Sequence, residues 1–437
     1  MYKNLILSLI LSLFFVLETK SLENNANEKS SVQEIPLLNE STLKLLFVVA
    51  RHGEIYPNNY MMDANKKYEF AHYRFPPGEL NKKGKLTMYN LGNKISLMYP
   101  GFLSNDANYE TVKVSAVGST GTLSTRLGAL LALKGLKGED LKETLRTRKW
   151  SAQSLSTTRN DEFTDAASDL SCPNYLKKQK IALKKELFPT TKNTKSIQEK
   201  FIEVSNINTY DETQSIIDVI NKNTAANITE NNLVPLLHIY DLYEATHLCD
   251  FGLPPWFDEN FWLPFHFIVK RYVNASFSTI DLRLLGGGRL VKYFLERLDD
   301  KMQGKLEPCD TKLLLHIGYE ATVSAFFAAL GGEGGFTRLN DGKFLKSIRS
   351  YEGGHIIIEV HENECSDDYY LRMAYSEAIM LPHHEVIIND CGYPCKLSQL
   401  KKKLEKVAVD KSKWITECNK VNLPKKKSKK ITKIKKN

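Results

Sequence analysis

Apolar and polar residues follow one another along the first part of the chain in a pattern typical of alternating strands and helices. Leu43 to Ala50 is a nearly continuous apolar run of strand length, as expected of a central strand covered on both faces. Asn81 to Tyr99 carries apolar residues at helical spacing, with Asn81 as the expected N-cap. Alternation predicts a strand from Thr111 to Ala116, and the Leu- and Ala-rich stretch from Thr120 to Leu136 predicts a second helix.

The pattern changes between Cys172 and Lys301, where the chain is rich in Lys and Asn and shows helical periodicity. Two stretches with that periodicity are Lys195 to Val204 and Asp211 to Asn221. Later elements are predicted as a strand, a helix and two further strands, at Lys312 to Ile317, Ala321 to Leu330, His355 to His361 and Tyr369 to Tyr375. This order predicts an α/β sheet domain interrupted by an α-helical insertion.

The predicted fold class is therefore α/β, with a central sheet flanked by helices and an inserted α-helical cap. Five segments are predicted along the 437 residues. They are a signal peptide (1–21), the first part of the α/β core (22–171), a mainly α-helical cap (172–301), the second part of the core (302–422) and a lysine-rich disordered tail (423–437).

The first residues have the features of a secretory signal peptide. Lys3 provides a short basic start, a mainly apolar run follows from Leu5 to Leu17, and Thr19 and Ser21 are small residues suited to signal-peptidase cleavage. The apolar run is too short for a comfortable membrane span, although a short uncleaved anchor is the alternative. We therefore expect a secreted protein, and we favour secretion over lysosomal delivery.

The net charge of +9 is carried mainly by the ends of the chain. Leu423 to Asn437 contains eight lysines and no acidic residue, whereas the body of the chain is close to neutral. A strongly basic nucleic-acid-binding body is excluded, because such a domain needs a basic face and not only a basic end. The lysine tail could bind a polyanion, or it could remain a solvated tail without a partner.

The cysteines and sequons add expectations that depend on secretion. The chain has seven cysteines, so at least one is unpaired or pairs with another chain. Cys391 and Cys395 flank a short, turn-rich loop, which makes a local disulfide plausible, and no second ligand pair supports a zinc site. Sequons at Asn39, Asn227 and Asn274 predict glycosylation at the surface of a secreted protein.

The tripeptide Arg51-His52-Gly53 comes directly after the first predicted strand. Ligands of open α/β sheets bind at the carboxyl ends of strands, so this position favours a functional role. A histidine there can act as a phosphate-accepting nucleophile, and the planar fork of an arginine suits a phosphoryl group. The tripeptide alone is a weak indicator, since a capping or core histidine would give the same pattern.

Several separated motifs resemble the histidine acid phosphatase family, in particular its secreted and lysosomal animal members. The resemblance covers roughly Leu43 to Cys418, with motifs in the family's order: Phe47-Val-Val-Ala-Arg-His-Gly53 with Pro57, Pro77-Gly-Glu-Leu-Asn-Lys-Lys-Gly84, Cys172-Pro-Asn, Leu253-Pro-Pro-Trp256, Ala321-Thr-Val-Ser324, and the series Cys391, Cys395, Cys418. It implies a histidine-phosphatase-like central sheet flanked by helices, with a largely α-helical cap. It also implies a Cys172–Cys418 disulfide beside Cys391–Cys395, and homodimers are common in the family.

The resemblance further implies a two-step hydrolysis of phosphomonoesters that needs no cofactor or metal. His52 would attack phosphorus and form a phosphohistidine, while Arg51 would bind the phosphate. Glu320 stands where the family has the aspartate that protonates the leaving oxygen. Three arginines and a second histidine complete the family's site, because a phosphate dianion and its transition state need a dense positive cradle.

The chain departs from this pattern at three positions. Ile55 replaces the second motif arginine, Ser115 aligns with the third arginine, and Tyr319 replaces the histidine of the His-Asp pair. His316 lies inside the preceding predicted strand, where we do not expect it to substitute. A charge-assisted hydrogen bond is worth about 1.5–3 kcal/mol. Three losses acting independently would remove roughly 5–8 kcal/mol of transition-state stabilisation, or about four to six decades in rate.

These departures favour a pseudoenzyme that binds an unknown small-molecule or protein ligand in the cleft where the family binds its substrate. The alternative is an active acid phosphatase that hydrolyses phosphomonoesters through a phosphohistidine at His52. Other candidates are weaker. Gly286 to Gly288 and Gly331 to Gly335 lack nucleotide-binding spacing and are predicted to be loop turns, and the adjacent His383 and His384 are not expected to bind a metal.

Overall fold

The computed structural model describes residues 40–65, 76–103, 111–117, 123–142, 172–189, 209–362 and 368–420. All of these residues belong to one compact unit, Leu38–Asn437. Several predictions lie outside the described residues, namely the signal peptide, the Asn39 sequon, the helix at Lys195 to Val204, Cys365 and the lysine tail.

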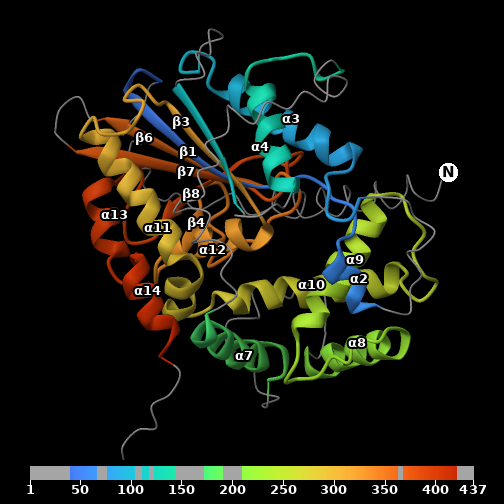
Figure 1. Cartoon of the computed structure of the whole chain (residues 1–437). Coiled ribbons are helices and arrows are strands. Elements are labelled where there is room, and N and C mark those ends of the chain that lie inside the picture. Colours follow the sequence, from blue (N-terminus) through green and yellow to red (C-terminus); the bar gives the residue numbers. More distant parts are fainter. Residues whose placement is uncertain are drawn as a thin grey trace, which may run out of the picture. The chain divides into compact units, whose positions relative to one another are not determined.

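A mixed β-sheet organises the unit, and its described strands run in the order β2-β3-β1-β6-β7-β8-β4-β5, with β9 paired to β7 (Figure 1). Strands β2, β3 and β1 pair in parallel, and the pairs from β1 through β6 and β7 to β8 are antiparallel. The strand bounds are β1 (Leu43–Arg51), β2 (Val112–Ala116), β3 (Leu313–Gly318), β4 (Phe336–Arg338), β5 (Phe344–Leu345), β6 (His355–Glu362), β7 (Tyr369–Ser376), β8 (His384–Ile388) and β9 (Cys395–Lys396). The α/β fold class is confirmed, as are the five strands predicted from the pattern.

The helices of the described residues fall before, within and after the predicted cap segment. The first group is the short η1 (Glu40–Thr42), α2 (Asn59–Ala64), α3 (Lys82–Met98) and α4 (Leu123–Leu136). Within 172–301 lie α7 (Pro173–Leu187), α8 (Thr209–Asn223), α9 (Val234–Leu248), α10 (Glu259–Ser276) and α11 (Ile280–Met302). After β3 come α12 (Glu320–Leu330), α13 (Leu397–Leu404) and α14 (Lys411–Cys418). Asn81 caps α3 as predicted, because its side chain accepts a hydrogen bond from Gly84 N.

The central strand β1 is buried on both faces, which explains its continuous apolar run. Residues at odd positions, such as Phe47 and Val49, belong to a core cluster shared with α11, α12 and α13. Residues at even positions, such as Val48 and Ala50, belong to a second cluster shared with α3 and α4. Successive side chains of a strand point to opposite faces, so one apolar strand holds both helical layers against the sheet.

A third core cluster joins α7, α8, α9 and α10, and it is rich in aromatic side chains such as Tyr240, Tyr243 and Phe265. The helix α11 also lies in the predicted cap segment, but it packs differently. Its buried residues Leu290, Val291 and Phe294 belong to the core of the sheet. The last helix of the predicted cap therefore covers the sheet instead of the cap's own core.

The prediction of a loop turn at Gly286 to Gly288 is wrong, because these glycines lie inside α11. The reason is close packing. A Cβ added to Gly287 would lie 2.2 Å from the carbonyl oxygen of Ala325 in α12, and one added to Gly288 would lie 2.3 Å from that of Val407. Glycine is required here for the approach of two backbones. Gly331 to Gly335 form the predicted loop after α12, with positive φ angles at Gly332 and Gly335.

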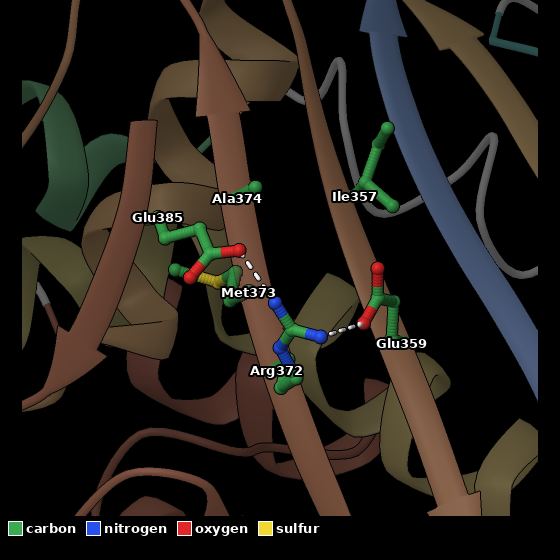
Figure 2. A pocket seen from close by; sticks show the side chains of 6 residues that line it. All are labelled: Ile357, Glu359, Arg372, Met373, Ala374 and Glu385. Atoms are coloured by element: carbon green, nitrogen blue, oxygen red, sulfur yellow. Dashed lines mark hydrogen bonds and ion pairs between the residues drawn. The ribbon is translucent and has the colours of Figure 1, made fainter. Parts of the chain in front are cut away.

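Three neighbouring strands carry a cross-strand ion cluster, here called the sheet cluster (Glu359, Arg372 and Glu385), which Figure 2 shows. Arg372 Nε also donates to the hydroxyl of Tyr393, in the loop between β8 and β9. Arg372 of β7 lies 3.6 Å from Glu359 of β6 and 2.5 Å from Glu385 of β8. Glu359 and Arg372 are direct register partners, so the pairing follows from the strand alignment. The cavity at this point measures only about 10 Å³, too little to suggest a ligand site.

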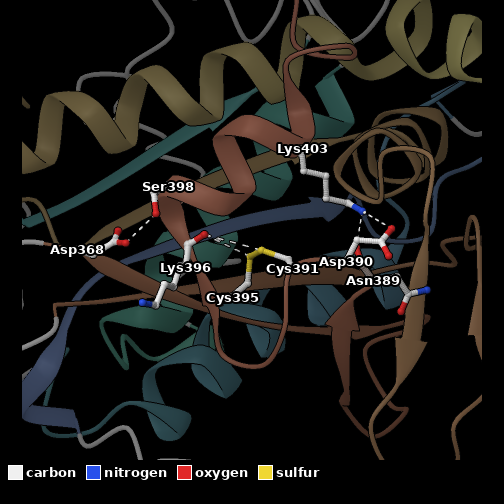
Figure 3. The surroundings of a disulfide bond; sticks show 8 residues. All are labelled: Asp368, Asn389, Asp390, Cys391, Cys395, Lys396, Ser398 and Lys403. Atoms are coloured by element: carbon white, nitrogen blue, oxygen red, sulfur yellow. Dashed lines mark hydrogen bonds and ion pairs between the residues drawn. A yellow bond between two sulfur atoms is a disulfide. The ribbon is translucent and has the colours of Figure 1, made fainter.

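The structure contains both disulfides that the resemblance implies. Cys172–Cys418 joins the start of α7 to the end of α14, and Cys391–Cys395 closes the loop between β8 and β9 (Figure 3). Cys249 and Cys309 are free thiols, with Cys309 exposed. Among the described residues, no helix is both long and apolar enough to span a membrane.

Candidate active site

The candidate site lies at the carboxyl end of β1, beside the segment that follows β3 and the segment that precedes β6. Arg51 is the last residue of β1, and its register partner on the parallel strand β3 is Gly318. Tyr319 and Glu320 therefore follow β3 at the same edge of the sheet. The antiparallel β6 begins at this edge, where Gly354 O accepts a hydrogen bond from Arg51 N. The topology brings the predicted residues together from strands that are far apart in the sequence.

His52 is almost fully buried, with 5% of its surface exposed. Its Nδ1 lies 2.7 Å from Gly53 O, and because a carbonyl oxygen only accepts, Nδ1 carries the proton in the neutral ring. That tautomer leaves the lone pair on Nε2. Burial and the charge of Arg51 lower the pKa of His52 to about 4, so the ring is neutral and nucleophilic near neutral pH. The Tyr319 ring stands edge-on to His52, with centroids 5.7 Å apart.

Arg51 is surrounded by acceptors from the protein itself. Its Nη1 donates to Ser350 O at 2.7 Å and lies 3.5 Å from the Glu320 carboxylate. Its Nη2 lies 2.9 Å from Glu352 and 4.0 Å from Glu244. Burial alone would lower the pKa of Arg51, but the three carboxylates raise it above its ordinary value. The cation that would bind phosphate is already paired with anions.

A second arginine, Arg349, which no sequence motif marks, completes this network. It is 1% exposed, its Nε donates to Glu320 at 3.1 Å, and its Nη2 lies 3.3 Å from Glu244. Its guanidinium carbon lies 4.3 Å from the ring centre of Tyr240 and 5.0 Å from that of Tyr351. We call the five charged residues the site cluster (Arg51, Glu244, Glu320, Arg349 and Glu352).

None of the three positions at which we expect a departure from the family pattern carries a positive charge. Ile55 forms an isolated β-bridge with Leu80 and packs against apolar neighbours. Ser115 is buried near the end of β2, and its hydroxyl is hydrogen bonded to Nδ1 of His316. His316 is buried inside β3, and burial with the charge of Arg297 lowers its pKa to about 3. It is a buried residue of β3 that is neutral near neutral pH.

Carboxyl groups outnumber cations at the site. The site cluster has two arginines against three glutamates, and Asp241 and Glu54 add carboxyl groups close by. Burial, together with neighbouring carboxylates such as Glu352, raises the pKa of Glu244 to about 7, although Arg349 opposes the shift. Burial and the charges of Glu320 and Glu244 also raise the pKa of Asp241 well above its usual range. Groups of this kind gain from a nearby cation and not from an anion.

Glu244, Glu352 and Arg349 were not predicted as site residues from the sequence. Arg349 and Glu352 lie in the connection between β5 and β6, which has no periodic pattern to mark a function. One signal was present for Glu244. It lies with Asp241 in the mainly apolar helix α9, where two acidic residues on a buried element are unusual. In the described part of the chain, no group of three or more His, Cys, Asp or Glu residues is arranged to hold a metal ion.

Comparisons with known proteins agree with the fold. The sequence model of the histidine phosphatase superfamily (branch 2) matches residues 42–376. The Hafnia alvei phytase in complex with myo-inositol hexakis sulphate is similar with a TM-score of 0.55 and 13% identity, over 88% of this chain and 99% of that one. The D. castellii phytase gives 0.51 and 16%, over 90% and 84%. The Bifidobacterium longum multiple inositol polyphosphate phosphatase with phosphate gives 0.51 and 13%, over 80% and 88%. No curated protein matches the chain.

Proposed function

The chain belongs to the histidine phosphatase superfamily (branch 2), and from that premise we propose a secreted, phosphatase-like protein with weak or no phosphatase activity that works by binding a ligand or partner in its cleft. The single observation that carries the proposal is the pairing of Arg51. Its outer nitrogen atoms face Glu320, Glu352 and Glu244, so carboxylates of the protein itself offset the charge of Arg51.

Electrostatics explains why this pairing opposes phosphate chemistry. A phosphate at Arg51 would have to displace carboxylates from the guanidinium and would then lie beside them. Two like charges about 4 Å apart repel by about 4 kcal/mol at an effective dielectric constant near 20. The family's cradle would offset this repulsion with further cations, but Ile55, Ser115 and Tyr319 provide none. Both the missing cations and the added carboxylates reduce the stabilisation of a phosphoryl transition state.

The second candidate is an active acid phosphatase, and the geometry of His52 favours it. The Nδ1 contact with Gly53 O directs the lone pair to Nε2, as a nucleophilic histidine requires. Glu320 starts α12 beside Arg51 and could donate the proton to the leaving group. Phytase and inositol phosphatase structures share the fold, so a phosphate ester would be the substrate class to test.

An assay of 4-nitrophenyl phosphate between about pH 4 and 7, beside a His52→Ala control, separates the two candidates. We expect no turnover above the control. Clear turnover by the wild type that disappears in His52→Ala would overturn the pseudoenzyme proposal and support the acid phosphatase. The same assay with inositol hexakisphosphate covers the larger substrate class.

The proposal includes the five predicted segments, secretion, glycosylation and polyanion binding by the lysine tail. Asn227 and Asn274 are exposed, which supports their use as glycan acceptors. N-terminal sequencing after expression in insect cells should begin at Leu22, and deletion of Lys425 to Asn437 should weaken retention on heparin. Homodimer formation, implied by the family resemblance, is checked by light scattering of the same preparation.

A further inference from the structure

Helix α7 concentrates positive charge on a body that is otherwise close to neutral. Its 15 residues include five lysines and one acidic residue, Glu186, which pairs with Arg271 at 3.2 Å. One side of the helix packs against α10, α11 and α14 (Figure 1). The exposed residues on its other side include four lysines and no acidic residue. We call these four lysines the α7 face (Lys177, Lys180, Lys184 and Lys185).

Three lysines of the α7 face form a row along the helix axis. Lys177, Lys180 and Lys184 are spaced three and four residues apart, so they are neighbours on the helix surface. At 1.5 Å per residue, the row covers about 10 Å along the axis. Like charges at this spacing repel and destabilise a helix, so the stability of α7 does not account for the row.

Most of this charge is not compensated within the protein. Lys177, Lys180 and Lys185 form no ion pair with any described residue. Lys184 pairs with Glu230 at 2.7 Å, but the two side chains are 50% and 33% exposed. An exposed pair is worth little, so Lys184 can exchange its partner for a ligand anion. By contrast, three lysines of α13 and the turn after it each pair with an acidic residue.

The chain connects the start of α7 with the lysine tail. The Cys172–Cys418 disulfide holds the start of α7 beside the end of α14, and Asn174 Nδ2 donates to Glu417 O at 2.8 Å. Lys425, the first lysine of the tail, follows Cys418 by seven residues, which span at most about 25 Å. The α7 face and the tail can therefore contact the same extended anion, and two linked contacts bind more tightly than either alone.

The arrangement of the α7 face favours a linear sulfated glycan over a membrane or a single-stranded nucleic acid. A helix that lies in a membrane surface needs a continuous apolar side. The exposed apolar residues Leu176 and Ile181 are instead about 140° apart around the helix, with the lysine row between them. Single strands bind where aromatic side chains stack on bases, and no aromatic residue is among the exposed residues of α7. A row of lysines alone suits a ligand that presents repeated anionic groups.

We propose that the α7 face binds a linear sulfated glycan, with the lysine tail as a second contact. The proposal rests on the secretion that the proposed function includes, because sulfated glycans are found outside cells. Anionic lipid membranes and duplex DNA are the occupants that the test can find in its place.

Isothermal titration calorimetry of the full secreted protein with a heparin octasaccharide, at 0.15 M NaCl and pH 7.5, tests the proposal. The α7 variant, in which Lys177, Lys180 and Lys184 are all replaced by Gln, should bind at least tenfold more weakly than the wild type. The slope of log Kd against log salt concentration should also fall by roughly two to three, because about one counterion is released for each lysine that contacts the polyanion. Unchanged affinity would overturn the proposal, since the tail alone would then account for binding.

A matched control separates a local site from the net charge of the protein. The control variant replaces three exposed lysines of other segments, Lys82, Lys305 and Lys402, by Gln and removes the same charge. It should bind the octasaccharide as the wild type does. Equal weakening in the control and the α7 variant would show that only net charge matters and would overturn the proposal. If the α7 variant does not fold, Lys180→Gln alone should weaken binding about fourfold and Lys82→Gln should not.

Two further measurements test the choice of occupant. The variant with both Leu176→Gln and Ile181→Gln should keep the octasaccharide affinity, and a tenfold loss would show that apolar contacts, rather than the lysine row, carry the binding. Vesicles of phosphatidylcholine and phosphatidylserine in a 7:3 ratio test for a membrane, and a short DNA duplex tests for a nucleic acid. If the α7 variant loses binding to either probe but keeps its octasaccharide affinity, that probe's class is the occupant and the glycan proposal is overturned.

The two proposals fail in different ways. Turnover of 4-nitrophenyl phosphate that depends on His52 would end the pseudoenzyme proposal whatever the calorimetry shows. A secreted protein without turnover whose octasaccharide affinity does not depend on the α7 face would leave the proposed function in place and overturn the glycan site alone.

Discussion

Two ion clusters in the described part of the chain differ in how they are assembled. The sheet cluster joins Arg372 to Glu359 and Glu385 on adjacent strands, and its side chains keep 19–41% of their surface exposed. The site cluster joins residues of β1, α9, α12 and the connection before β6, with side chains 1–15% exposed. Water can still solvate the charges of a partly exposed cluster when one partner is removed, so the loss of stability is small. In the buried cluster, the loss of any one member leaves an unpaired charge away from water, so the loss of stability is large.

The largest expected effect is on stability. Arg349→Met would remove the nearer of the two arginines that Glu244 and Glu320 share in a buried place and leave them with Arg51, so we expect a loss of about 3–5 kcal/mol in the free energy of unfolding. Arg372→Met in the sheet cluster is the matched change and should cost about 1 kcal/mol or less. Urea unfolding of both variants measures the difference. Equal losses would show that the two clusters are energetically alike and would remove the contrast between them.

The pH dependence of stability sharpens the same contrast. The pKa of Glu244 is raised to about 7 in the folded protein, above the ordinary 4.5. Its stabilising contribution is therefore fully present below about pH 4.5 and is lost as the pH rises through about 7, since the unfolded chain releases the proton first. Relative to Glu244→Gln, the wild type should lose about 3 kcal/mol across this window.

The quantity to measure is the difference between wild type and Glu244→Gln in urea unfolding at several pH values. Effects of pH on groups that do not interact with Glu244 are common to both proteins and cancel in the difference. Asp241 does interact with Glu244, which raises its pKa, so the difference reports the two carboxyl groups together. A difference that stays constant from pH 4.5 to 7 would contradict a raised pKa at Glu244. Such a result would also weaken the inference that the carboxyl groups of the site have too few cations beside them.

A smaller effect is expected on anion binding. Glu352→Gln removes the carboxylate nearest to Arg51, at 2.9 Å, and keeps the shape of the side chain. The freed guanidinium should bind inorganic phosphate about tenfold more tightly, a change of about 1.4 kcal/mol. Glu385→Gln makes the same chemical change in the sheet cluster and should have no effect on phosphate binding. Calorimetry at one ionic strength compares the variants, and equal affinities would show that Arg51 is not held back by its own carboxylates.

The contrast between the clusters also explains which parts of the protein the sequence could predict. The strands β1, β3 and β6 are apolar along nearly their whole length, because a strand buried on both faces needs a continuous apolar run. Strand β7 alternates instead, as a strand with one buried face does. His52 and Glu320 were found because motifs mark them. Arg349 and Glu352 have no such mark, since their role depends on where a connection before β6 lies relative to β1.

The same limit applies to the glycines of α11. Gly286 to Gly288 resemble a turn in the sequence, and only the packing of α11 against α12 shows why they are needed in a helix. Local propensity favours a break here, but the close approach of two helices determines the outcome. Tertiary contacts of this kind, like the carboxylates around Arg51, cannot be predicted from the local sequence, because the contacting residues lie far apart along the chain.

The smallest predicted effect concerns salt. Screening weakens pairs that water can reach, and it acts much less on pairs that are buried. The stability lost in Arg372→Met should therefore shrink by a few tenths of a kcal/mol between 0.1 and 1 M NaCl, on the order expected for exposed pairs. The loss in Arg349→Met should hardly change, because Arg349 is 1% exposed. If salt reduces both losses in proportion, water and ions reach the site cluster, and the carboxylates around Arg51 would then be a weaker barrier to phosphate than their burial implies.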